Sequence, residues 1–184
     1  TRIPLIVRIP VSLREGKQGR QHTIDSQLIS SIDFAPTVLN LAGVDVPGHM
    51  QGRAFLGGKL GAARRYVYGA RDRMDERYDI IRMVRDSRFR YIRNYEPLKP
   101  YYQYMNTPEK GATMKEIRRL EKTGGLSGAA LLFSAGRKPV EELYDLENDS
   151  HEVNNLAANP EHSDRLKTMR EAHYRWVRET RDIG

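Results

Sequence analysis

The chain of 184 residues contains no cysteine. Disulfide bonds, zinc sites built from thiolates and cysteine nucleophiles are therefore excluded within it. The absence leaves the cellular compartment open, because a chain without cysteine suits reducing and oxidising surroundings alike. Long apolar runs are missing as well, so we expect no transmembrane helix and no membrane partner.

The beginning of the sequence lacks both an initiator Met and the apolar core of a signal peptide. It runs Thr1-Arg2-Ile3-Pro4 and continues directly into a short apolar segment. We therefore expect the chain to be part of a longer polypeptide, whose missing N-terminal part would be its first partner.

Positive charge is concentrated in one stretch of the chain. The net charge is +7, and between Arg64 and Arg93 there are ten Arg, no Lys and five acidic residues, which gives +5 for that stretch. The guanidinium group binds planar anions in a bidentate manner, so this stretch predicts a partner carrying sulfate, phosphate or carboxylate. The alternative is a solvated, ion-paired sheet face, because acids are interleaved with the arginines.

Nucleic-acid binding is a rival explanation for a pI of about 9.7. However, the sequence carries no recognised DNA-binding or RNA-binding motif, and acidic residues interrupt every basic run. We therefore expect no nucleic-acid partner.

The first third of the chain predicts pieces of an α/β sheet domain. Ile3 to Pro10 is a short apolar run between prolines, as expected for a buried strand. Asp33 is a helix-capping residue, Pro36 suits a first helical turn, and Gly43 is a candidate C-cap. Residues 46–61 contain five Gly and one Pro, which indicates a surface loop that leads to a domain boundary.

The remainder predicts antiparallel strands covered by one long helix. The expected strands are Tyr66–Ala70, Ile80–Val84, Phe89–Ile92 and Leu143–Leu146. Alternation places Phe89 and Tyr91 toward the core. The long helix would begin at Asn159-Pro160, and His173 on its apolar face is expected to be a packing residue. Residues 95–140 show no clear period apart from a short helix at Lys115–Lys122, and such long insertions are usually functional or mobile.

A calcium loop at the end of the chain is rejected on its residues. Asp145, Glu147 and Asp149 occupy the first, third and fifth positions of an EF-hand loop. Ser150 stands where the loop needs Gly, and Leu156 stands where it needs Glu. We therefore expect an ordinary turn after a strand.

Three segments, in this order, resemble the C-terminal part of type I sulfatases, the formylglycine-dependent branch of the alkaline-phosphatase-like superfamily. The first matches the tail of the family stretch Glu-Gly-Gly-x-Arg-x-Pro-x-Ile-x-Arg-x-Pro through Arg2, Pro4, Ile6, Arg8 and Pro10. The second is Ser31–Gly43 with Pro47 and Gln51-Gly52, and the third is Glu142–Asp149 with Glu152, Asn155 and Leu156. Arg71-Asp72-Arg73, Ile81–Arg85 and Trp176–Asp182 most resemble the heparan N-sulfatase-like branch.

The resemblance implies a fold and an organisation. Residues 1–61 would be the C-terminal end of the large α/β sulfatase domain. Residues 62–184 would be a small α+β subdomain, in which an antiparallel sheet packs on a long C-terminal helix and an irregular insertion spans 95–140. The family's compartments are exported, periplasmic or lysosomal.

The resemblance also implies an activity whose central residues this chain lacks. Sulfatases hydrolyse sulfate esters or sulfamates with a formylglycine made in a Cys/Ser-x-Pro-x-Arg motif and with a calcium ion held by Asp and Asn. The chain has neither that motif nor an Asp-Asn pair of the calcium type. We therefore expect no catalytic and no metal-binding residue in it, and no activity from it alone. Calcium and formylglycine are implied for the full-length enzyme only.

The predicted contribution of the chain is substrate binding. In such enzymes the C-terminal sheet borders the substrate pocket, and Arg71, Arg73, Asp75 and Glu76 lie in the expected loop after the first strand. We expect the arginines to pair with sulfate or carboxylate of a sulfated sugar, and the acids to bind hydroxyl or amine groups. The alternative is an ion-pair cluster at the end of a hairpin.

A second hypothesis assigns the chain no substrate contact. It would then serve packing and homo-oligomerisation, with the 95–140 insertion wrapping a neighbour. Tyr101, Tyr102, Tyr104 and Met105 would be the interface anchors.

Overall fold

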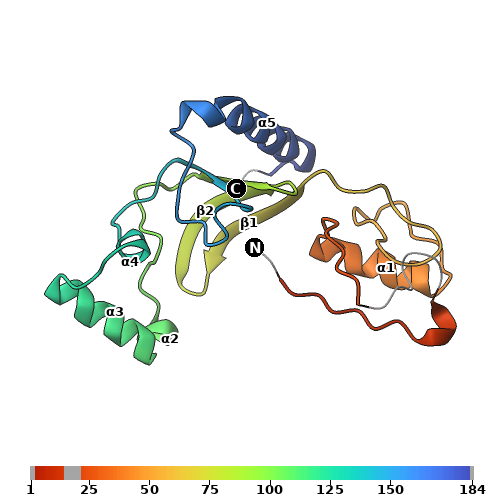
Figure 1. Cartoon of the computed structure of the whole chain (residues 1–184), viewed down its shortest axis with the longest axis horizontal. Helices are drawn as coiled ribbons and strands as arrows, with labels where there is room; N and C mark the ends of the chain where they lie inside the picture. The colour runs from red at the N-terminus through yellow and green to blue at the C-terminus, as the bar shows by residue number, and fades with distance from the viewer. Residues whose placement is uncertain (1–2, 15–21, 183–184) are drawn as a thin grey trace. The chain divides into compact units, whose positions relative to one another are not determined.

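The computed structural model describes residues 3–14 and 22–182, which divide into two units (Figure 1). The boundary between the units falls between Arg64 and Arg65. Arg2, which carries part of the family resemblance, lies outside the described residues. Within the described ranges, no helix is both long enough and apolar enough to cross a membrane.

The expected strand at Ile3 to Pro10 does not form in the first unit. This segment has no strand assignment, and its apolar side chains are exposed, with Ile6 at 92%. A strand requires a neighbour to bond its backbone groups. The segment has no such neighbour among the described residues, so the apolar pattern alone does not produce a strand.

The helix α1, Phe34–Leu41, follows a 3-10 turn at Ser31–Asp33. The predicted capping glycine, Gly43, follows the end of the helix with φ +71°, and the Val44 amide donates to the Leu39 carbonyl at 2.9 Å. The buried residues of this helix are Pro36 and Thr37. Val38 is 64% exposed, whereas Thr37 is buried.

Polar side chains of α1 bond the loop that follows the helix. The Thr37 hydroxyl accepts from the Phe55 amide at 3.1 Å, and the Asn40 side chain donates to the Leu56 carbonyl at 2.6 Å. Gly52 passes so close to the Ile32 carbonyl that a Cβ atom would collide with it. Side chains of α1 therefore fix the loop predicted over 46–61 through hydrogen bonds to the backbone of that loop.

Asp33 is the centre of this first unit. Its carboxylate accepts from the amides of Ser30 and Arg53, each at 2.8 Å, and from the Arg64 Nε at 2.7 Å. Burial alone would raise the pKa of Asp33, but the Arg64 guanidinium and the two amides outweigh burial and lower that pKa. Asp33 thus occupies the predicted capping position. Its carboxylate also accepts hydrogen bonds from Arg53 and Arg64, which are distant in the sequence.

The second unit is a four-stranded antiparallel sheet in the order β1-β2-β3-β4, with the long helix α5 on one face (Figure 1). The strands are β1 (Val67–Met74), β2 (Arg77–Arg85), β3 (Phe89–Asn94) and β4 (Glu141–Asp145), and α5 spans Ser163–Thr180. Phe89 and Tyr91 lie in the core with Leu143 and Met169, as predicted. Trp176 of α5 stacks on Tyr68 at 5.1 Å.

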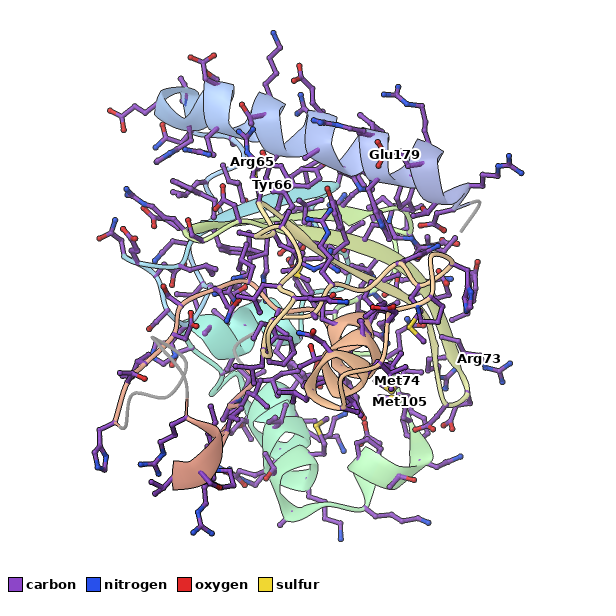
Figure 2. All side chains as sticks on the ribbon, turned by 90° about the vertical axis from the view of Figure 1, so that its right-hand side faces the viewer. Arg65, Tyr66, Arg73, Met74, Met105 and Glu179 are labelled. Atoms are coloured by element: carbon purple, nitrogen blue, oxygen red, sulfur yellow. The ribbon has the colours of Figure 1, made fainter. Side chains whose placement is uncertain are left out.

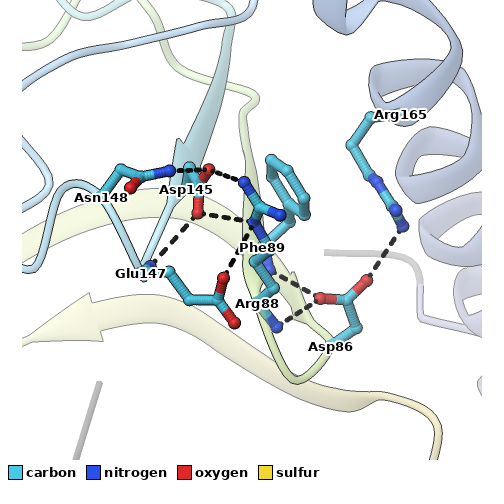
Figure 3. A network of polar contacts seen from close by, with 7 residues as sticks. All are labelled: Asp86, Arg88, Phe89, Asp145, Glu147, Asn148 and Arg165. Carbon is cyan, nitrogen blue, oxygen red and sulfur yellow. Dashed lines mark hydrogen bonds and ion pairs between the residues drawn. The ribbon is translucent and has the colours of Figure 1, made fainter.

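The segment after β4 is an ordinary turn, as predicted, and polar contacts join it to the β2–β3 turn (Figure 3). The Asp145 carboxylate accepts from Arg88 Nε at 3.0 Å and from Asn148 Nδ2 at 2.9 Å. The Arg88 guanidinium holds the pKa of Asp145 below its usual range. Across the corner, Asp86 pairs with Arg165 of α5 at 3.2 Å. These carboxylates are committed to holding the β2–β3 turn, the end of β4 and α5 together.

The insertion at 95–140, which we call the arm, is more regular than its sequence predicts. It contains α2 (Asn106–Glu109), α3 (Ala112–Thr123) and α4 (Ala129–Phe133), of which only part of α3 was expected. Its stem is closed by backbone bonds from Asn94 to Val140 at 3.0 Å and from Lys138 to Pro97 at 2.9 Å. The Lys138 ammonium pairs with Asp79 of β2, and both side chains are fully buried.

His173 packs in the core as predicted, and its environment makes stability depend on pH. It is fully buried, and its Nε2 bonds the Tyr95 hydroxyl at 2.9 Å. Burial, together with Arg93 and Arg82, lowers the pKa of His173 to about 4. The acidic groups Asp182 and Glu141 act in the opposite direction but are weaker.

We expect the free energy of unfolding to decrease as the pH falls from 6.5 to 4. Over this range His173 binds a proton in the unfolded chain but stays neutral in the folded chain. The contribution of His173 is at most about 3 kcal/mol. Urea unfolding at pH 7 and pH 4.5 should show a smaller pH effect in His173→Gln, which cannot titrate. An equal pH effect in both proteins would contradict this assignment.

The buried pair of Asp79 and Lys138 yields a second prediction. Lys138→Ala should lower the free energy of unfolding by roughly 3–5 kcal/mol, because it leaves a buried carboxylate without its partner. The double variant Asp79→Leu/Lys138→Met should recover most of that loss. Arg119→Ala breaks an exposed pair of the arm with Glu116 and should cost less than about 1 kcal/mol. Equal losses for Lys138→Ala and Arg119→Ala would argue against the stem pair.

Candidate functional site

The predicted substrate residues gather at the end of the β1–β2 hairpin, residues 71–78, which we call the hairpin tip. Strand β1 continues to Met74, so Arg71 and Arg73 lie on the strand and not in the loop expected after it. Asp75 and Glu76 form the two-residue turn between Met74 and Arg77. Figure 2 shows Arg73 at this end of the hairpin with its side chain pointing away from the ribbon.

Both arginines lie on the sheet face that is not covered by α5. Arg71 pairs with Ile81 and Arg73 pairs with Tyr78, so β2 carries one extra residue between these pairs. The bulge is in β2, and β1 keeps its alternation, which places Arg71 and Arg73 on one face. Asp72, between them, points to the opposite face and bonds Arg82 at 2.7 Å.

The four predicted residues do not form the ion-pair cluster that was the alternative to a substrate site. In the described part of the chain, Arg71, Arg73, Asp75 and Glu76 make no ion pair with one another or with other residues. Arg73 Nε donates to the Asp75 carbonyl at 2.7 Å, and Asp75 has a φ of 47°. Arg71 Nε is buried without a hydrogen-bond partner among these residues. Among the described residues, the two guanidinium groups therefore have no ion-pair partner.

The arm crosses the hairpin tip and adds residues that sequence analysis missed. Glu76 accepts from the Asn106 amide at 2.8 Å, and Lys99 and Gln103 both donate to the Tyr78 carbonyl at 3.2 Å. Arg77 Nε donates to the Tyr104 carbonyl. These partners lie 21 to 30 residues apart in the sequence, so no local pattern could reveal them.

The tyrosines proposed as oligomer anchors have different surroundings. Tyr102 stacks on Phe133 at 5.0 Å and lies under the Arg118 guanidinium at 5.5 Å, inside the arm. Burial next to Glu142 raises the pKa of Tyr101. Tyr104 is 51% exposed. Of the three, Tyr104 presents the most surface to a ligand or partner.

Metal binding finds no support in the side chains. Within residues 3–14 and 22–182 no group of three or more His, Asp or Glu side chains is arranged to hold a metal ion. These residues therefore do not fit the calcium site that the sulfatase resemblance implies for the full-length enzyme.

A family model described as N-sulphoglucosamine sulphohydrolase, C-terminal, matches residues 1–123. The chain belongs to this sulfatase family. Two ulvan-active sulfatases of Formosa agariphila are 42% identical over 174 residues and 31% identical over 188 residues. The matches cover 95% and 99% of this chain but only 28% and 34% of the relatives. This sulfatase chain thus spans about a third of the length of these relatives.

Solved structures of sulfatases share the fold. A putative sulfatase from Bacteroides thetaiotaomicron and a 2-O GAG sulfatase each give a TM-score of 0.54 at 24% identity, over 82% of this chain and 25% of theirs. A sulfatase solved with its substrate D-glucosamine-2-N,6-O-disulfate gives 0.51 at 19% identity, over 82% of this chain and 24% of its own. The predicted fold class, an α/β sulfatase fragment with an antiparallel sheet on a long helix, is confirmed.

The contact between Glu76 and the arm gives a direct test of the tip geometry. Glu76→Ala should increase amide hydrogen exchange at Asn106 several-fold, because the amide loses its carboxylate acceptor. Asp75→Ala, at the neighbouring turn position, serves as the matched control. Unchanged exchange at Asn106 in Glu76→Ala would show that the arm does not rest on the tip.

Proposed function

We propose that this chain is the C-terminal part of a sulfatase that hydrolyses sulfate esters or sulfamates on a sulfated sugar. In this proposal the chain completes the fold and borders the substrate pocket, while the nucleophile comes from the rest of the enzyme. The family membership supports the reaction class. The names of the similar proteins, which refer to ulvan, to GAG and to a disulfated glucosamine, support a sulfated sugar as the substrate.

The observation that carries the substrate role is the pair of guanidinium groups of Arg71 and Arg73, which share one sheet face and have no ion-pair partner among the described residues. Unpaired arginines favour anionic ligands, because each can make two charge-assisted hydrogen bonds to a sulfate or carboxylate group. Asp75 and Glu76 beside them can accept bonds from sugar hydroxyl or amine groups. The strand holds both arginines in place and orients the substrate.

The chemistry that cleaves the sulfate bond is assigned to the part of the enzyme beyond this chain. Formylglycine would supply the nucleophile and calcium would neutralise sulfate oxygens there. The residues of this chain bind and orient the substrate, and they supply neither group.

Arg73→Ala in the full-length enzyme tests the substrate role. We expect the Michaelis constant for a sulfated sugar to rise about tenfold, since a charge-assisted hydrogen bond contributes roughly 1.5–3 kcal/mol. The melting temperature should not change, because Arg73 is exposed. Arg175→Ala, which removes another exposed arginine, from α5, should leave the kinetics unaltered. Wild-type kinetics in Arg73→Ala would refute the substrate role.

A further inference from the structure

The helix α1 turns apolar side chains to solvent. Phe34, Val38 and Leu41 are 45%, 64% and 61% exposed. Their spacing of four and then three residues places them on one face of the helix, which we call the apolar stripe. A surface helix normally directs such a stripe toward the core, so the exposed stripe of α1 requires an explanation.

Hydrogen bonds fix the orientation of α1 and keep the apolar stripe outside. The Thr37 hydroxyl accepts from the Phe55 amide, and the Asn40 side chain donates to the Leu56 carbonyl. A rotation of the helix that buried the stripe would break these bonds and leave polar groups without partners, which costs free energy. The first unit therefore cannot cover the stripe by turning the helix.

The first unit also lacks a hydrophobic core that could receive the stripe. Among its described residues, Ala54 is the single buried hydrophobic residue, and the polar residues Asp33 and Thr37 are buried instead. The second unit, by contrast, buries a hydrophobic cluster that includes Tyr91 and Leu143. Because apolar burial is the main favourable contribution to folding, the first unit depends on a surface outside itself.

The chemistry of the stripe defines the surface that fits it. The sequence from Phe34 to Val44 contains no charged residue and no His, and Val44 is itself 52% exposed. An apolar surface gains free energy by covering this segment. A polar surface would lose its water there without gaining hydrogen bonds, so it is disfavoured.

The comparisons supply a partner of sufficient size. The matched regions are 28% and 34% of the two ulvan-active sulfatases, so most of each relative lies outside the part that this chain matches. An apolar surface on the same polypeptide would meet the stripe at high effective concentration and would need no second molecule.

We propose that the apolar stripe of Phe34, Val38 and Leu41 is the face on which the first unit docks to the part of the enzyme beyond this chain. The contact provides the hydrophobic core that the first unit lacks. This inference rests on the proposed function only in taking the chain as part of a longer enzyme.

Thiol labelling of the full-length enzyme tests the docking face. In Val38→Cys, iodoacetamide should modify position 38 at least about tenfold more slowly in the native enzyme than in urea, as measured by mass spectrometry of the peptide. Lys59→Cys is the matched control in the same unit, because Lys59 is 84% exposed, and it should react equally fast in both states. Val38→Ser should lower the melting temperature by roughly 4 °C, and Lys59→Ser should leave it unchanged.

Each outcome decides the inference. Protection of position 38 at concentrations where light scattering gives a monomer supports the docking face. Protection that disappears when a dimer is diluted to monomers assigns the stripe to a second copy and overturns the inference. Equal labelling in native and urea-unfolded enzyme overturns it, and so does equal protection in the 184-residue chain alone. Failure of the proposed function is seen separately, as an enzyme that protects position 38 but releases no sulfate from a sulfated sugar.

Discussion

The buried ion pair between Asp79 and Lys138 is the constraint on which the rest of the second unit depends. Two fully buried charges are tolerated only as partners. Asp79 of β2 and Lys138 near the end of the arm must therefore lie in contact. That meeting places the stem of the arm beside β2 and brings residues 99–106 across the hairpin tip. The candidate site is therefore a consequence of where the arm begins and ends.

Local patterns predicted the elements whose stability is local. Alternation of apolar residues located the strands and assigned Phe89 and Tyr91 to the core, because a strand with one covered face must alternate. Gly43 predicted the end of α1, since few other residues adopt its positive φ. The same kind of pattern failed at Ile3 to Pro10, where a strand depends on neighbours that no local sequence supplies.

The candidate site was predictable in part. Sequence analysis named Arg71, Arg73, Asp75 and Glu76 because the family resemblance implies that the C-terminal sheet borders the substrate pocket, and these residues surround the turn expected after the first strand. It could not name Tyr104 or Lys99 as their neighbours, because an ion pair or a hydrogen bond across more than twenty residues depends on the folded arm. Nor could it foresee that β2 would carry an extra residue, which sets Tyr78 opposite Arg73.

The arginine-rich stretch from Arg64 to Arg93 shows why total charge is a poor guide to function. Arginines that form ion pairs within the described residues include Arg64, Arg82, Arg88, Arg90 and Arg93. The alternative of ion-paired arginines thus holds for a large part of the stretch, where the charge stabilises the fold. Arg71 and Arg73 differ because the acids next to them in the sequence do not pair with them: Asp72 bonds Arg82, and Glu76 bonds the arm. Two of the acids near the tip are thus used elsewhere in the fold, and net charge alone would not have shown which arginines they leave without an ion-pair partner among the described residues.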